Sequence, residues 1–260
     1  MTSGPVPTGA VTVQLVARDL TRLRHHPGTA LNLLFLPVFL VVIWSRGFAA
    51  EARLDGFPAR TVLDWIVPLA VLSACSSAAL IPGFAVARDI EGGFFDRLLV
   101  APVRPLGLVA GPLVAGICRA VVPLFVVLGV AVVLGADLPG GFPGIAMLVV
   151  AAGGTAVCAA GWAVGLAMRL RSIRRSVHVM QTGSAVVLYL STGLAPVAFM
   201  STWLRAVARV NPATPVFAMA RQGFIGPVTW SQTWPGLCAL GGGAAVLTTF
   251  AVRGLRRLEP

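Results

Sequence analysis

The sequence predicts an all-α membrane protein with six transmembrane helices in one domain over residues 1–260. The chain is 57% hydrophobic and only 11% charged, and its mean hydropathy is +0.88. A soluble domain averages about 45–50% apolar and about 25% charged residues. Long apolar runs also alternate with short segments that carry arginine. A soluble protein with a fully buried helical core is the alternative that composition alone leaves open.

The segment before the first apolar run, residues 8–26, predicts an amphipathic helix in the membrane interface. Three apolar residues in it share one helical face, at i, i+4 and i+7: Val16, Leu20 and Leu23. Arg18 and Arg22 fall off that stripe. A helix of this kind lies in the plane of the interface, with its apolar face in the lipid.

Six apolar runs are long enough to cross a membrane, which takes about 20 residues each. The predicted spans are residues 29–48, 61–84, 106–134, 143–168, 177–199 and 234–252. Arginines set their orientation, because cytoplasmic loops carry an excess of positive charge. With the N-terminus inside, 13 arginines lie in cytoplasmic segments and 6 outside. We therefore expect both termini in the cytoplasm.

The segment 88–104 concentrates charge between two apolar runs and predicts a short cytoplasmic helix. On a helix, Phe94 pairs with Leu98 and Phe95 with Leu99, which gives an apolar ridge. The charged residues around that ridge are Asp89, Glu91, Asp96 and Arg97. Two interpretations stay open: a solvated loop at the lipid headgroups, or a docking helix for a cytoplasmic partner. An apolar anchor ringed by polar groups is how interface hot spots are built.

The sequence lacks the motifs of several enzyme classes. It contains no lysine, so a GxxxxGK[ST] phosphate-binding loop cannot occur. It has no HExxH or GxSxG motif, and its cysteines form no metal-binding spacing. The arginines flank apolar runs rather than forming a basic stripe, so we expect no nucleic-acid partner. We predict no metal site, no directly bound cofactor and no catalytic residue.

Two charged residues fall within or beside the predicted spans. Arg119 lies roughly midway along the third span, where its side chain could reach the interface, form a structural ion pair or line a transport path. Asp64 lies near the outer end of the second span and is expected to be a carboxylate at the membrane boundary.

Two motifs resemble those of permeases in the ABC-2 transporter family. In EGGFFDRLLVAPV, the family pattern matches Glu91, Gly93, Asp96, Leu98, Leu99, Pro102 and Val103. In GLAPVAFMSTWLRAVARVNPATPVFAMARQGF, it matches Pro196, Trp203, Leu204, Asn211, Pro212 and Arg221. The resemblance covers nearly the whole chain and is closest to the bacterial drug-exporter branch, typified by the daunorubicin-resistance permease. The basic stretch RLRSIRRSVH departs from that branch and leaves the cargo class open.

The resemblance implies a dimer of six-span subunits in the bacterial cytoplasmic membrane, exporting a hydrophobic or amphipathic compound. Each subunit would dock one of two copies of a separate ABC ATPase through residues 88–104, and ATP and Mg²⁺ would be bound in that partner. Residues 201–232 would form two short re-entrant helices on the outer side. An ion- or proton-coupled transporter is the alternative, but it should show carboxylates deep in the membrane, and none is obvious beyond Asp64.

Overall fold

The structure is a computed structural model that describes residue 21 and residues 27–93 and 105–257. Those ranges are helical throughout, with turns between the helices and no strand. The α-helices are α2 (Pro27–Gly47), α3 (Val62–Glu91), α5 (Pro105–Val133), α6 (Gly141–Leu170), α7 (Ile173–Tyr189), α8 (Thr202–Val210), α9 (Ala213–Ile225) and α10 (Trp230–Leu255). Two 3-10 turns, η1 (Ala49–Arg53) and η2 (Val197–Phe199), connect them.

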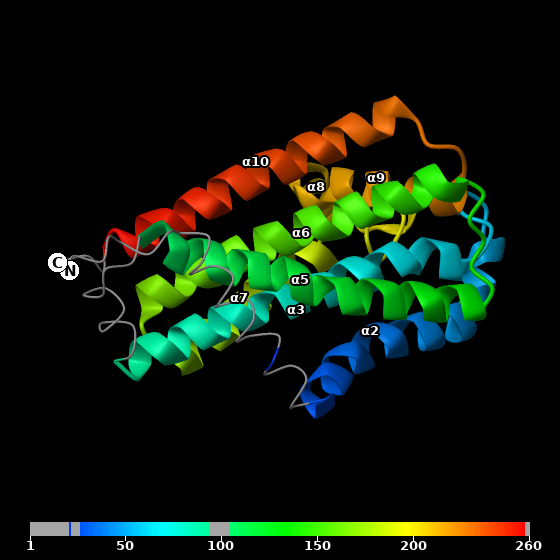
Figure 1. Cartoon of the computed structure of the whole chain (residues 1–260). Helices are drawn as coiled ribbons and strands as arrows, with labels where there is room; N and C mark the ends of the chain where they lie inside the picture. Colours follow the sequence, from blue (N-terminus) through cyan, green and yellow to red (C-terminus); the bar gives the residue numbers. More distant parts are fainter. Residues whose placement is uncertain (1–20, 22–26, 94–104, 258–260) are drawn as a thin grey trace.

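The long helices run side by side as a bundle, with α3 at its centre (Figure 1). α3 packs against α2, α5, α6 and α7, and α10 packs against the far side of α6. Most side chains of α3 are buried in the bundle, whereas α10 buries few of its own. We call the end of the bundle where α3, α6 and α10 begin the Asp64 end, and the opposite end the Glu91 end.

Four described helices are long and apolar enough to cross a membrane: Val62–Glu91, Gly107–Val133, Gly141–Leu170 and Trp230–Leu255. They coincide with the predicted second, third, fourth and sixth spans. Large apolar side chains stay exposed on their outer faces, as lipid-facing surfaces require; Phe125 is 61% exposed and Val246 is 67% exposed. The chain is a multi-pass, all-helical membrane protein.

The predicted first span corresponds to α2, whose described apolar part, Leu34–Gly47, is shorter than a full crossing. Six spans therefore remain a prediction.

The predicted fifth span, 177–199, is wrong over its second half, because α7 already ends at Tyr189. After it, the Ser191 hydroxyl accepts a hydrogen bond from the backbone N–H of Gly193 (3.2 Å) in place of a helical carbonyl. Pro196 then supplies no backbone N–H for a continuing helix. A Cβ at Gly193 would lie 2.9 Å from the Phe217 ring, so the backbone of this turn packs closely against the Phe217 side chain of α9.

The predicted helix over 88–104 also needs a correction at its start. α3 continues without a break to Glu91, so Asp89 and Glu91 lie in its last turn rather than at the start of a new helix. No helix-breaking residue occurs between Phe84 and Glu91, and the first stop signal is Gly92–Gly93. Gly93 has a φ of +69°, a conformation that suits glycine at a helix end. The ridge residues Phe94, Phe95, Leu98 and Leu99 and the charged residues Asp96 and Arg97 beside them lie outside the described residues. The predicted helix over 8–26 does too, apart from Thr21.

Glycine allows the closest helix contacts in the bundle. A Cβ added at Gly223 of α9 would lie 2.7 Å from the Cα of Gly144 on α6, and Gly161 packs directly against the Leu247 backbone of α10. Backbones in contact gain dispersion and lose little side-chain entropy, which is how helices associate in lipid. These contacts hold α9 and α10 against α6.

Candidate functional site at the Asp64 end

The start of α3 is fixed by a capping box. The Thr61 hydroxyl accepts the Asp64 backbone N–H (3.1 Å), and the Asp64 carboxylate accepts the Thr61 backbone N–H (3.2 Å) and hydroxyl (2.7 Å). This reciprocal pairing satisfies donors that the first helical turn leaves unpaired. The sequence TVLD, with Thr and Asp three residues apart, encodes it locally.

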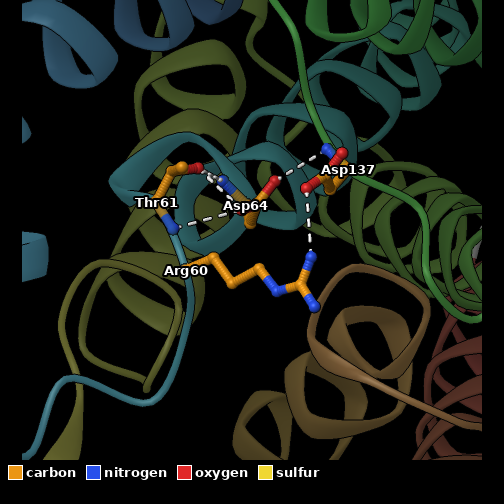
Figure 2. A network of polar contacts seen from close by, with 4 residues as sticks. All are labelled: Arg60, Thr61, Asp64 and Asp137. Carbon is orange, nitrogen blue, oxygen red and sulfur yellow. Dashed lines mark hydrogen bonds and ion pairs between the residues drawn. The ribbon is translucent and has the colours of Figure 1, made fainter.

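Asp64 also joins two parts of the chain that are far apart in sequence (Figure 2). Its second carboxylate oxygen accepts the backbone N–H of Asp137, in the connection between α5 and α6, at 3.1 Å. The Asp137 carboxylate lies 3.5 Å from the Arg60 guanidinium, in a pair exposed to solvent. Asp64 itself is fully buried. It stands at the end of its helix, where the sequence placed it, and its role there is structural.

Arg221 is the buried cation of this end. It lies on α9, only 4% exposed, with its guanidinium 3.4 Å from the centre of the Trp65 ring on α3. Its Nη2 donates to the carbonyls of Thr192 (2.9 Å) and Gly193 (3.3 Å), and its Nε donates to the Trp65 carbonyl (3.4 Å). Arg221 thus connects α9 to α3 and to the turn after α7.

Burial lowers the pKa of Arg221 to about 9, so the side chain is still charged at neutral pH. Sequence reasoning treated this arginine as one of six outer charges and missed its burial. The available signal was its position as the single charge in the apolar segment ATPVFAMARQGFI, a pattern in which a charged group faces the protein interior.

The neighbouring Gln222 organises the connection from α9 to α10. Its amide oxygen accepts the Thr229 backbone N–H (2.6 Å), and its amide nitrogen donates to the Thr233 hydroxyl (3.0 Å). These contacts fix the loop 226–229 and the start of α10 against the C-terminal part of α9.

A cavity of about 570 Å³ opens between the start of α3, the end of α9 and the start of α10. Its lining is Pro58, Trp65, Ala218, Arg221, Gln222, Ile225, Gly226, Pro227, Thr229 and Gln232. The cavity combines apolar walls with one buried cation and several polar groups, which is the usual chemistry of a small-ligand site.

The predicted outer segment does contain two short helices, α8 and α9. At the corner between them, the Asn211 side chain donates to the carbonyls of Val187 (2.8 Å) and Leu190 (3.1 Å) and accepts the Ala213 N–H (2.9 Å). Pro212 follows at the N-cap of α9, and Trp203 is 63% exposed on α8. Pro196 is buried in the turn before η2. The Asn-Pro pair therefore fixes a corner, and the re-entrant character of these helices stays a prediction.

The other predicted site residues lie elsewhere. Arg119 is only 6% exposed and faces the protein interior near the middle of α5. At the Glu91 end, the Glu91 carboxylate accepts the backbone N–H of Ile173, the first residue of α7, at 2.6 Å. A carboxylate at a helix N-terminus is favoured by the unpaired N–H groups and by the helix dipole. The last turn of α3 is thereby linked to the start of α7.

A family model described as ABC-2 type transporter matches residues 11–225, which include the cavity residues up to Ile225. No curated protein matches the chain.

Proposed function

Because the chain belongs to the ABC-2 type transporter family, we propose that it is the membrane-spanning permease of an ATP-driven exporter. Family membership is the observation that carries this proposal. Membrane domains of this family are transport subunits that are not catalytic themselves and normally pair with an ABC ATPase. ATP and Mg²⁺ would be held in that partner, of which two copies serve a dimer of permeases.

The contacts at the Glu91 end support a route for the mechanical signal. In the proposed mechanism, the ATPase moves the segment 88–104, whose first four residues form the last turn of α3. The hydrogen bond from Glu91 to Ile173 would make the start of α7 follow that movement. α3 is 30 residues long, or about 45 Å at 1.5 Å per residue, and it ends in the Asp64 capping box and at Trp65 beside Arg221. A displacement at one end can therefore alter packing at the other.

The finer features rest on the resemblance. We propose a homodimer in a bacterial cytoplasmic membrane, with both termini cytoplasmic, and a hydrophobic or amphipathic cargo of the drug-exporter type. Residues 1–260 contain no lysine and therefore no P-loop, which supports an ABC ATPase that lies outside this membrane domain.

An ion- or proton-coupled mechanism has less support. Asp64 is the only buried carboxylate in the described part of the chain. Its two oxygens accept bonds from Thr61 and Asp137 at the end of a helix, which is the geometry of a cap rather than of a relay along a path.

Co-purification with an ABC ATPase from the same source tests the proposal. The double variant Phe95→Ala/Leu99→Ala removes the predicted apolar ridge, and Asp96→Arg reverses a charge beside it. If these are hot-spot residues, each variant should weaken binding by about 2 kcal/mol or more, roughly thirtyfold. The control is Val133→Ala/Phe142→Ala, which alters two exposed apolar residues at the Asp64 end (87% and 80% exposed).

Wild type and control should bind the ATPase and stimulate ATP hydrolysis, while the ridge variants insert normally and do not bind. If the ridge variants bind as tightly as wild type, residues 88–104 are not the docking segment. If the ATPase does not bind even wild type, the exporter proposal fails.

A further inference from the structure

We propose that the cavity beside Arg221 binds a phosphate group, carried by an anionic phospholipid or by a soluble organic phosphate. This inference does not depend on the transport function or on its direction.

The first reason is that not all N–H groups of the Arg221 guanidinium form hydrogen bonds within the described structure. Its Nε and Nη2 donate to three backbone carbonyls, but Nη1 forms no hydrogen bond with any described residue. Carbonyl acceptors are neutral, and the described residues provide no carboxylate within ion-pair distance of this guanidinium. A buried guanidinium that keeps its charge and has unpaired N–H groups at Nη1 is suited to an oxyanion.

The second reason is an independent unpaired donor. Trp65 lines the same cavity, and its indole Nε1–H is buried without a hydrogen-bond partner in the described structure. Buried polar groups are normally satisfied, so such a group needs an explanation. Trp65 is only 7% exposed and its ring lies 3.4 Å from the guanidinium carbon of Arg221, so the two side chains are packed together at the cavity wall.

The charge of the residues that line the cavity favours an anionic ligand. Arg221 is its one charged residue, and none of the other nine is acidic. A cationic ligand would be repelled, and the Trp65 ring face is already covered by the guanidinium. Gln232 and Thr229 add polar groups at the wall, while Pro58, Ala218 and Ile225 can contact the carbon skeleton that bears the phosphate.

The place of the cavity makes a phospholipid available. It lies at an end of the spanning helices, and Trp230, the first residue of α10, directly follows the lining residue Thr229. Trp230 is 72% exposed and Trp234 is 50% exposed. Exposed tryptophans at the ends of spans mark the headgroup level of a bilayer, where lipid phosphates lie.

The experiment measures ligand binding to the full-length permease in detergent by native mass spectrometry. The probes are dioctanoyl phosphatidylglycerol, glycerol 3-phosphate and dioctanoylglycerol, which has the same tails but no phosphate. Gly226→Leu adds a bulky side chain at the wall of the cavity and leaves Arg221 intact, since a Cβ at Gly226 meets no atom within 4 Å and its backbone is extended. Gly242→Leu is the matched control, because Gly242 on α10 is equally open but outside the cavity. Arg221→Gln removes the charge.

We expect phosphatidylglycerol to bind wild type and Gly242→Leu at least tenfold more tightly than Gly226→Leu or Arg221→Gln, and more tightly than dioctanoylglycerol. Competition by glycerol 3-phosphate would identify a soluble phosphate as sufficient, and its failure to compete would identify the lipid. If Arg221→Gln does not fold, Gly226→Leu decides alone. Equal binding by Gly226→Leu and Gly242→Leu, or no binding of either phosphate probe to wild type, would overturn the proposal.

Discussion

At the scale of single residues, two buried charges at the Asp64 end, Asp64 and Arg221, join helices to neighbouring segments. Asp64 caps α3 and holds the connection between α5 and α6 through Asp137. Arg221 holds α9 to α3 with its guanidinium on Trp65. In each case the charged side chain bonds mainly to backbone groups, which have no other partner where a helix ends or turns.

We predict that Asp64→Ala lowers stability by about 1–2 kcal/mol, because it removes the helix cap and the acceptor that joins Thr61 to Asp137. Thermal unfolding in detergent measures this as a lower melting temperature. Arg60→Ala is the control: its pair with Asp137 is exposed on both sides (76% and 61%), and such pairs contribute about 0–1 kcal/mol. A melting temperature that falls no further for Asp64→Ala than for Arg60→Ala would contradict the structural role of Asp64.

At the scale of elements, close helix crossings decide the arrangement of the Asp64 end. α9 meets α6 backbone to backbone, and the N–H of Gly140 donates to the Gly223 carbonyl at 3.0 Å. The short helix α9 is too short to span a bilayer and depends on such contacts for its place. Small residues, which allow close backbone contact, thus hold these helices together, a role that large apolar side chains have in the cores of soluble proteins.

We predict that Gly223→Ala destabilises the protein by about 1–3 kcal/mol. Its Cβ would lie 2.7 Å from the Gly144 backbone, and relieving that clash would require the backbones of α6 and α9 to move apart. The matched control is Gly153→Ala on α6, whose Cβ would meet no atom within 4 Å. That control should be neutral or stabilising by up to about 1 kcal/mol, since alanine favours a helix. The comparison is again by thermal unfolding, and equal melting temperatures would refute the close crossing.

The contact between Glu91 and Ile173 predicts a different kind of defect. Glu91→Ala should leave the melting temperature nearly unchanged, because the contact is exposed, but it should weaken the link between α3 and α7. In membranes reconstituted with the ATPase, we expect transport per ATP hydrolysed to fall severalfold. Glu51→Ala, an exposed glutamate at the Asp64 end, should behave as wild type. Unchanged coupling in Glu91→Ala would show that this contact does not transmit motion.

At the scale of the whole molecule, the arginine distribution distinguishes the two ends of the helix bundle. The ends of α3, α6 and α10 and the starts of α5 and α7 share the Glu91 end. The described arginines at these helix ends are Arg88, Arg169, Arg171, Arg174, Arg175, Arg253, Arg256 and Arg257. The excess of positive charge predicts that the Glu91 end faces the cytoplasm.

Cysteine labelling in intact cells checks that orientation. In a variant whose native cysteines are replaced by alanine, Leu54→Cys and Phe142→Cys should react with a membrane-impermeant maleimide, because both positions are exposed at the Asp64 end. Arg171→Cys, at the Glu91 end, should react only after the cells are permeabilised. The reverse pattern would invert the predicted topology.

The sequence by itself determined the helical membrane class, the four long spans, the two short helices before α10 and the family. These follow from hydropathy over about 20 residues and from local stop signals, which act within a few turns. Its errors fall where local signals were weak. α3 passes the predicted end of its span because no residue between Phe84 and Glu91 breaks the helix, and α7 ends at Tyr189 although the residues after it are still mostly apolar.

Only the tertiary structure decided which polar groups meet. Arg221 and Trp65 are 156 residues apart, and Asp64 and Asp137 are 73 apart. No local pattern encodes such pairs, because they form only when the glycine contacts have set the distance between helices. The cavity and its unpaired donors exist for the same reason: burial of a charge is a property of the packed bundle, whereas hydropathy is a property of the chain.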